Sequence, residues 1–185
     1  MNYAALAEAA SIIAQGGIVA YPTESCYGLG CDPRCNAAIR RLLRLKRRPR
    51  DLGLIVIAAH IDALAGYFVP LEASRMQRVE ATWPGPVTWL LPAHPATSSW
   101  VTGGHDTVAL RVTDHPGAAA LCRHTRRALI STSANRHGRA PARSVAAVSR
   151  QFGTEIDYVL DGRLGRLKRP TQIRDARTDT VVRAA

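Results

Sequence analysis

The sequence contains no apolar run approaching the roughly 18–20 residues that a membrane-spanning helix requires, which excludes an integral membrane protein. Its first fifteen residues include no lysine or arginine, so the basic flank of a signal peptide is missing and we expect a cytoplasmic protein. Only four cysteines occur in 185 residues, and no histidine lies at zinc-ligand spacing from them. We expect reduced, structural thiols and no metal site; the cysteines are Cys26, Cys31, Cys35 and Cys122.

Several nucleotide-binding and hydrolase signatures are also missing. The chain has no G-x-x-x-x-G-K-[ST] loop, no G-x-G-x-x-G, no G-x-S-x-G and no H-E-x-x-H. This disfavours a standard NTPase, dehydrogenase, α/β-hydrolase or zincin. A bound nucleotide would have to be held by scattered lysine, arginine and hydroxyl groups.

Positive charge is abundant, and it is unevenly distributed. Lysine and arginine total 25 against 14 acidic residues, for a net charge of +11, and only Lys46 and Lys168 are lysines. The first 33 residues have no basic group, whereas basic residues cluster in three segments: 40–50, 123–150 and 163–177. Arginine-rich codon usage explains the preference for arginine but not the clustering, so we expect an anionic partner.

The hydropathy pattern predicts a single domain covering residues 1–185. Apolar residues recur at helical spacing from Tyr3 to Ile13, and further helices are expected near 36–47, 61–67, 71–81, 116–124 and 144–152. Short apolar runs predict strands at 18–21, 54–58, 87–91, 108–112, 129–130 and 158–160. Strands alternating with helices indicate an α/β or α+β domain around one mostly buried sheet.

The helix expected near residues 36–47 has one apolar and one basic face. Lys46 falls within the apolar face. Its ammonium group either extends past the helix end into solvent or points into a cleft as a compact charge for phosphate. The other face is more typical of a solvated or RNA-facing surface; it consists of Arg40, Arg41, Arg44, Arg47 and Arg48.

Three further segments place polar groups at strand ends or on strand faces. GGIVAYPTESCYGLG (16–30) runs from a strand into a polar turn, where α/β folds often bind ligands, although it could be an ordinary hydroxyl-capped turn. In TVALRVTDHP, strand alternation puts Thr107 and Arg111 on one face, and Arg111 requires a carboxylate or phosphate, external or internal. ALISTSAN would present Ser131, Ser133 and Asn135 together if extended, or form a hydroxyl-rich turn.

Together these segments resemble the TsaC/YrdC family, the threonylcarbamoyl-AMP synthases, in their short bacterial form. The matching elements spread across nearly the whole chain in the family's order: GGIVAYPTESCYGLGCDP, LKRRP followed by GLIVIAA, TWPGPVT, VALRVTDHP, STSAN, and a terminal GRL with PTQIRDA. The combination of PTE, K-x-R, WPGP and SAN is highly specific. The resemblance implies a twisted mixed sheet with flanking helices around a basic concave groove.

The family's activity implies condensation of L-threonine, bicarbonate or CO2 and ATP to threonylcarbamoyl-AMP and pyrophosphate, with Mg²⁺ accompanying the triphosphate. The product would pass to a transferase complex that modifies tRNA. The resemblance also implies that tRNA or double-stranded RNA is a direct binding partner. Carried over by motif, the nucleotide and its phosphates would be gripped by the catalytic residues Lys46, Arg48, Ser133 and Asn135, with Arg50, Thr107 and Arg183 completing that site. The threonine pocket would be lined by Thr23, Arg111, Ser131 and Thr171.

Two departures from the family pattern occur near these motifs. Arg136 and His137 follow SAN, where relatives commonly carry a serine before the glycine. The terminal motif has Thr171 and Gln172 in place of a more usual Ser-Thr or Ser-Glu pair, which preserves a hydroxyl at Thr171.

Two other functions are compatible with parts of the sequence. A non-catalytic module for structured RNA would use the +11 charge, but aromatic residues are only 5% of the chain and no RRM or KH signature is present. A carbamoyl-adenylate domain of a hydrogenase-maturation or antibiotic-carbamoylating protein would share the fold but normally has further domains.

Overall fold

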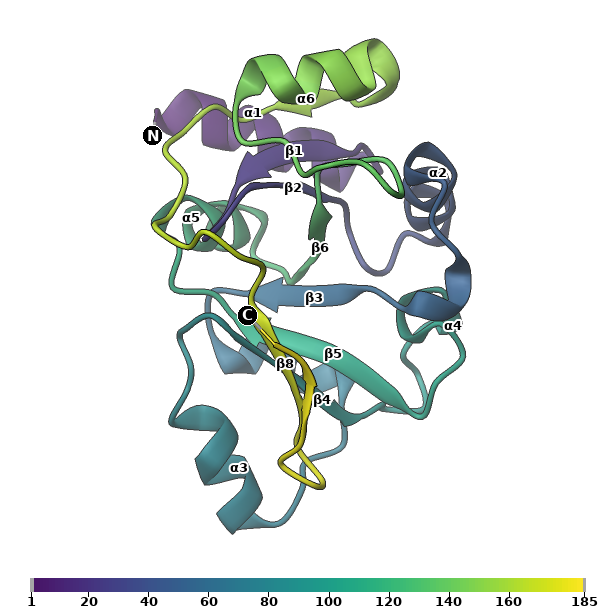
Figure 1. Ribbon diagram of the computed structural model, residues 1–185, viewed down its shortest axis with the longest axis vertical. Helices are drawn as coiled ribbons and strands as arrows, with labels where there is room; N and C mark the ends of the chain where they lie inside the picture. The colour runs from purple at the N-terminus through teal and green to yellow at the C-terminus, as the bar shows by residue number, and fades with distance from the viewer. Residues whose placement is uncertain (1, 185) are drawn as a thin grey trace.

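The computed structural model describes residues 2–184 as one mixed α/β domain, which confirms the predicted fold class (Figure 1). A twisted nine-stranded sheet runs in the order β7-β1-β2-β6-β3-β5-β4-β8-β9. Three neighbouring pairs are parallel (β1/β7, β3/β5 and β4/β8), and the other five are antiparallel. The strands are β1 (Val19–Pro22), β2 (Tyr27–Gly30), β3 (Ile55–Ala58), β4 (Val87–Pro92), β5 (Thr107–Val112), β6 (Leu129–Ser133), β7 (Tyr158–Val159), β8 (Gln172–Asp175) and β9 (Val181–Arg183).

Helices flank the sheet on both faces. The α-helices are α1 (Tyr3–Ala14), α2 (Asn36–Lys46), α3 (Ala73–Glu80), α4 (Ser99–Thr102), α5 (Pro116–Thr125) and α6 (Val145–Phe152). Short 3-10 helices are η1 (Arg50–Leu52), η2 (Ile61–Tyr67) and η3 (Gly153–Glu155). The segment 61–67, which the sequence predicts to be helical, is a 3-10 helix. Within residues 2–184, no helix is both long and apolar enough to cross a bilayer.

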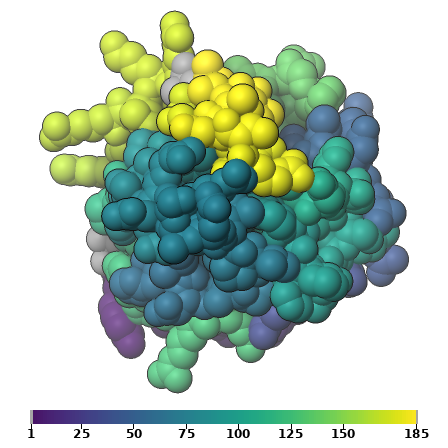
Figure 2. All heavy atoms as spheres, turned by 90° about the horizontal axis from the view of Figure 1, so that it is seen from below, coloured from purple at the N-terminus to yellow at the C-terminus, as the bar shows by residue number. Residues whose placement is uncertain are grey.

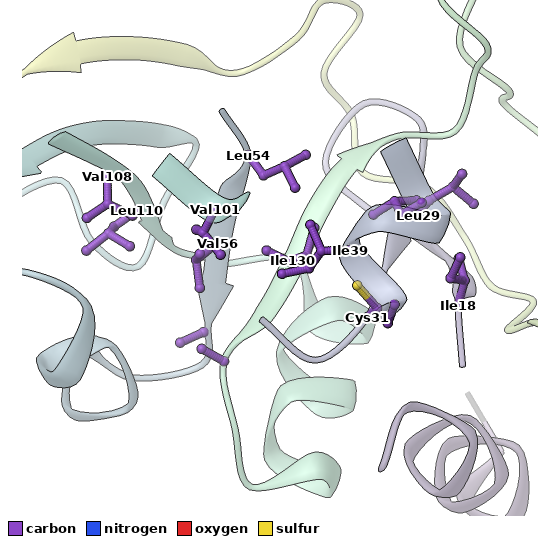
Figure 3. Close-up of a cluster of buried hydrophobic side chains, with 14 of the residues drawn as sticks. Ile18, Leu29, Cys31, Ile39, Leu54, Val56, Val101, Val108, Leu110 and Ile130 are labelled. Carbon is purple, nitrogen blue, oxygen red and sulfur yellow. The ribbon is translucent and has the colours of Figure 1, made fainter. Parts of the chain in front are cut away.

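Two hydrophobic clusters on opposite faces of the sheet hold the domain together. Helices α1 and α5 pack on one face, where Leu6 and Leu121 meet Val19 and Tyr21 of β1. The larger cluster lies against the other face, and Figure 3 shows Ile39 of α2 close to Ile130 of β6. Alternation along β5 sends Val108, Leu110 and Val112 into this second cluster, as predicted.

Three strands and one helix were absent from the sequence prediction. Strand β2 (YGLG) pairs with β1 and β6, strand β8 (QIRD) with β4, and β9 with β8 at the sheet edge. Helix α4 is a single short turn, below the length that periodicity can reveal. None of the three strands has an alternation of apolar and polar residues. Each forms because its neighbouring strands pair with it, so its own sequence pattern does not reveal it.

Candidate active site

A cavity of about 400 Å³ opens where the ends of β1, β5 and β6 meet the C-terminal segment. Six basic side chains line it against a single acidic one, Glu24, so its potential is strongly positive. The basic residues are Arg48, Arg111, Arg143, Lys168, Arg169 and Arg183. Leu54 and Ile55 form part of an apolar wall. The resemblance implied a basic concave groove, and the cavity has this character.

Arg111 lies at the inner end of this cavity on β5 and is only 4% exposed. Its Nη1 donates to the hydroxyls of Thr88 and Thr171, each at 3.0 Å. Its Nη2 donates to Glu24 Oε2 at 3.3 Å, so the internal carboxylate that the sequence left open as a partner is present. Nε is buried without a hydrogen-bond partner in the described structure. The Nε–H and one Nη2–H are therefore free, and these donors can hold a carboxylate.

Glu24 fixes this arginine from the turn after β1. Its Oε1 accepts a hydrogen bond from the Thr113 hydroxyl at 2.6 Å, and the side chain is only 6% exposed. A buried carboxylate needs such partners, because removal from water destabilises an unpaired charge by several kcal/mol. The sequence placed Glu24 in the PTE motif but gave it no role. Its partner lies 87 residues away, beyond the reach of local pattern.

Hydroxyl groups border the same pocket. Ser131 and Ser133 of β6, Thr23 of the turn and Thr171 before β8 all line the cavity. The Thr23 hydroxyl donates to the Cys26 carbonyl at 2.7 Å, which closes the turn. Gly28 of β2 lies next to Ser131 of the neighbouring strand β6, and a Cβ at Gly28 would lie 3.5 Å from the serine Oγ. The four residues predicted for threonine are thus brought together with Arg111 among them.

Lys46 is buried at 3% exposure and does not itself line the cavity. Its Nζ donates to the carbonyls of Ser133 and, at 2.7 Å, of Asn135. Burial lowers the pKa of Lys46 to about 8, and the nearby Arg48 adds to the shift. The ammonium group therefore supports the turn after β6 from behind and has one N–H left for a ligand.

Asn135 lies beyond the end of β6, so it does not extend the serine face as the alternation suggested. Its Oδ1 accepts from the Ser133 hydroxyl at 2.6 Å, and its Nδ2 donates to the carbonyls of Arg136 and Arg139. These bonds close a tight turn. Ser133 remains in the cavity lining, whereas Asn135 holds the turn in place.

Arg48 and Arg183 both line the cavity. Arg48 follows α2, which ends because Arg47 adopts a left-handed conformation and Pro49 cannot continue the helix. Arg48 Nη2 donates to the Gly53 carbonyl at 3.0 Å. Arg183 on β9 donates to the Thr171 carbonyl at 2.7 Å. Burial lowers the pKa of both arginines. The positive charges of Arg111 and Arg48 lower the pKa of Arg183 further.

Two residues predicted for the nucleotide site lie elsewhere. Arg50 stacks on Trp100 at 4.1 Å and donates to Ser99 Oγ at 2.7 Å, outside the cavity lining. Thr107 shares a strand face with Arg111 but lies four residues along β5, which is about 13 Å at 3.3 Å per residue. Thr107 and Arg111 therefore lie on the same face of β5, but only Arg111 lines the cavity.

A C-terminal strap, residues 161–171, closes one side of the cavity. Its Gly165 and Leu167 amides donate to the carbonyls of Thr23 and Glu24 at 2.9 and 3.0 Å. A Cβ at Gly165 would fall 2.6 Å from the Glu24 carbonyl oxygen, so this close approach needs glycine. His115 anchors the strap from outside by contacting the Arg163 carbonyl at 3.1 Å. In Figure 2 this yellow-green part of the chain carries side chains that project into solvent.

The comparison with known proteins agrees with this geometry. A sequence profile of the Sua5/YciO/YrdC family, described as "Telomere recombination", matches residues 11–185. The chain belongs to the Sua5/YciO/YrdC family. A curated family member from Halorhodospira halophila, named threonylcarbamoyl-AMP synthase, is 57% identical over 175 residues, covering 95% of this chain and 92% of its own. One from Nitrosococcus oceani with the same name is 54% identical over 170 residues, covering 92% of each.

A solved structure from this family is similar to this chain in both fold and sequence. The crystal structure of P. abyssi Sua5 complexed with L-threonine superposes with a TM-score of 0.86 at 32% identity, covering 92% of this chain and 50% of that one. The resemblance to this family expected from the motifs is confirmed.

Proposed function

We propose that this protein is an enzyme that condenses L-threonine, CO2 derived from bicarbonate, and MgATP into L-threonylcarbamoyl-AMP and pyrophosphate. The observation that carries the proposal is the buried Arg111, with its Nε unpartnered, among hydroxyl groups in a cavity with six basic side chains. A pocket of this kind suits a small carboxylate next to a polyphosphate. The names of the relatives at 57% and 54% identity support the same activity.

The threonine end is assigned to Arg111 and Glu24. The free donors of Arg111 bind the substrate carboxylate, and Glu24 is placed to accept from the amino group, which pairs both charges of an amino acid. The hydroxyls of Ser131 and Thr171 lie in the same lining and supply partners for the substrate hydroxyl. L-threonine in the P. abyssi Sua5 complex supports this choice of amino acid.

The nucleotide end is assigned to the other side of the cavity. Arg48, Ser133 and Arg183 are the groups that would meet the phosphates, with the remaining N–H of Lys46 behind the Ser133 turn. The apolar wall of Leu54 and Ile55 suits the adenine ring. Arg50 and Thr107 take no part in this assignment. Arg50 is held by Trp100 and Ser99, and Thr107 lies about 13 Å along β5 from Arg111.

The reaction then needs positioning and charge neutralisation more than a protein nucleophile. The neutral amino group of threonine attacks CO2 and forms an N–C bond while one C–O π bond opens. One N–H proton leaves to solvent, where the conversion of bicarbonate to CO2 and water takes up a proton, and the product is an N-carboxylate. An oxygen of that carboxylate attacks the α-phosphorus of ATP. The bond from the α-phosphorus to the bridging oxygen breaks, and the electron pair leaves with pyrophosphate. The arginines of the cavity stabilise the charge that accumulates on the phosphoryl oxygens. The reaction class is nucleotidyl transfer.

Mg²⁺ enters this scheme as part of the substrate MgATP. Residues 2–184 contain no group of three or more His, Cys, Asp or Glu side chains that could hold a metal ion. The phosphate oxygens and water therefore supply the ligands, as Mg²⁺ commonly prefers. The product is a reactive mixed anhydride, so we propose that a tRNA-modifying transferase consumes it.

Pyrophosphate release from ATP by the purified protein tests this function. We expect release only when bicarbonate and L-threonine are both present, and much less with L-serine or with no amino acid. Arg111→Met should abolish pyrophosphate release. Arg123 is an exposed arginine on α5, and Arg123→Gln should retain the threonine-dependent release. The proposal would be rejected if pyrophosphate release did not depend on threonine and bicarbonate, or if the folded protein released no pyrophosphate. The alternative of a non-catalytic RNA module is not favoured, because the named relatives are synthases.

A further inference from the structure

A second cavity, of about 530 Å³, lies at the opposite end of α2 from the candidate active site. It shares no lining residue with the first cavity. Asn36, at the start of α2, lines the second cavity, whereas Lys46, at the end of the helix, supports the turn beside the first. At 1.5 Å per residue the helix is about 16 Å long, so the two cavities are separate sites.

Three arginines border this second cavity. Arg34 donates to both oxygens of Asp32, from Nε at 3.2 Å and from Nη2 at 3.0 Å, and Arg127 Nη1 donates to Asp32 Oδ2 at 2.8 Å. Arg126 lines the cavity and makes no side-chain hydrogen bond or ion pair within residues 2–184. One buried carboxylate thus orients two guanidinium groups while a third stays uncompensated, which leaves a net charge of two positive units.

A neutral hydroxyl donor completes the cavity. Tyr67 lines it, and its hydroxyl makes no hydrogen bond within the described part of the chain. Burial raises the pKa of Tyr67, so the hydroxyl keeps its proton and can donate. Ser98 and Thr97 lie on the same lining, but both of their hydroxyls already donate within the protein. Ser98 Oγ donates to Asn36 Oδ1 at 2.7 Å, and Thr97 Oγ1 donates to the Tyr67 carbonyl at 2.8 Å.

The first turn of α2 faces this cluster without a side-chain cap. Cys35 is the N-cap and makes no side-chain hydrogen bond, and the first turn has no acidic residue. Helix N-termini present backbone N–H groups and a partial positive charge that an anion satisfies. Arginines from two distant segments, an unpartnered tyrosine hydroxyl and an uncapped helix end therefore converge on one cavity.

We propose that this second cavity binds a phosphate group of a ligand other than the ATP in the active site. Arginine forks, a hydroxyl and helix amides are the donors that recognise phosphate. Free pyrophosphate or a nucleotide and a phosphodiester of an RNA backbone share this chemistry, and the volume exceeds that of one phosphate. The proposal does not rest on the catalytic activity.

Amide NMR titration of the full chain with inorganic pyrophosphate tests the site, because each cavity reports through its own residues. We expect saturable shifts of the Asn36, Ala37 and Ala38 amides, distinct from those near Ser133. Arg126→Gln should weaken the binding seen at these amides about tenfold, as expected for one charged hydrogen bond. Arg123→Gln is the matched control, because Arg123 is an exposed arginine on α5 outside the lining. A second variant, Tyr67→Phe, removes only the hydroxyl.

A parallel titration with a short RNA duplex assigns the source of the phosphate. Shifts at residues 36–38 with pyrophosphate support a small phosphorylated ligand, and shifts with the duplex alone support a backbone phosphodiester. In both cases the Arg126→Gln effect must exceed that of Arg123→Gln. The proposal is overturned if neither probe moves these amides, or if the two arginine variants weaken binding equally, since that would indicate a general attraction to a basic surface.

Discussion

Lys46 combines deep burial with a charge that two carbonyl groups hold in place. Burial lowers its pKa to about 8, so its charge is present below that pH and is lost as the pH rises through it. With Mg²⁺ bound, the terminal phosphate of ATP stays ionised over this range. The affinity for ATP should therefore fall about tenfold from about pH 7 to about pH 9, in proportion to the charged fraction of Lys46.

Binding of a non-hydrolysable ATP analogue, followed by calorimetry across this pH range, measures the effect without the titration of the threonine amine. Lys46→Met is the control: it should bind more weakly at low pH and show a flat profile. Parallel profiles in the two proteins would mean that Lys46 does not sense the phosphates.

Glu24 and Arg111 form a buried ion pair, with 6% and 5% of their side chains exposed. Glu24→Gln keeps the shape and an acceptor for Thr113 but leaves the guanidinium without its counter-charge. Removing one partner of a buried pair should lower the free energy of unfolding by about 3 kcal/mol. Urea denaturation measures this loss. Glu72→Gln is the control, because Glu72 pairs with Arg75 while 63% exposed and should change stability by less than about 0.5 kcal/mol.

An equal, small loss in both variants would contradict this account of Glu24. L-threonine should also stabilise wild type against urea, since a bound ligand stabilises the native state by mass action.

At the scale of elements, η1 and the end of α4 are in backbone contact next to the cavity. Gly103 closes α4 with φ of 73°, and a Cβ there would lie 2.7 Å from the Gly53 amide nitrogen and 2.8 Å from the Asp51 carbonyl oxygen. Gly103→Ala must therefore displace the 50–53 segment, whose Gly53 carbonyl accepts from Arg48. We expect a stability loss of about 3 kcal/mol, composed of left-handed strain and this clash, together with weaker ATP binding.

Gly104→Ala separates the two causes. Gly104 also has positive φ, at 92°, but a Cβ there meets nothing within 4 Å. This variant should lose only the strain, about 1–2 kcal/mol, and should bind ATP like wild type. Thermal unfolding and analogue binding measured on both variants provide the comparison. Matching losses of ATP affinity would show that the close packing of η1 on α4 does not position Arg48.

The sequence predicted the helices and strands whose hydropathy pattern lies within the segment itself. Strand β5 alternates apolar and polar residues, and α2 has opposed faces, so both could be placed within a residue or two. Strand β2 (YGLG) carries two glycines and no alternation, and it becomes a strand because β1 and β6 pair with it on both sides. The pairing with β6 depends on residues about a hundred positions away and leaves no pattern in the segment itself.

The same distinction applies to the candidate site. Motifs located Arg111 and Ser131, which the structure places in one cavity. The Glu24–Arg111 pair and the strap contacts at Gly165 join segments far apart in the chain, so the sequence could not reveal them. The alternation that grouped Thr107 with Arg111 gave the correct face but no distance along the strand.

At the scale of the whole molecule, part of the net charge of +11 gathers at the first cavity, whose lining has six basic residues and one acidic residue. Six basic residues surround the first cavity, and the basic face of α2 extends the field beyond its rim. Charges lining a concave site raise the association rate of an oppositely charged ligand. At physiological ionic strength, salt largely screens this attraction at distances longer than about 8 Å. kcat/KM for MgATP should therefore fall several-fold as the salt concentration rises from about 50 mM to about 300 mM.

The KM for L-threonine provides an internal control for this last prediction, because a neutral zwitterion gains little from a long-range field. Steady-state kinetics at saturating threonine and then at saturating ATP separate the two substrates. If salt changed both substrates alike, general destabilisation of the protein would be the cause. If it changed neither, the arginine clusters would act only at contact distance, and their positions along α2 and the strap would have to be explained by local contacts instead.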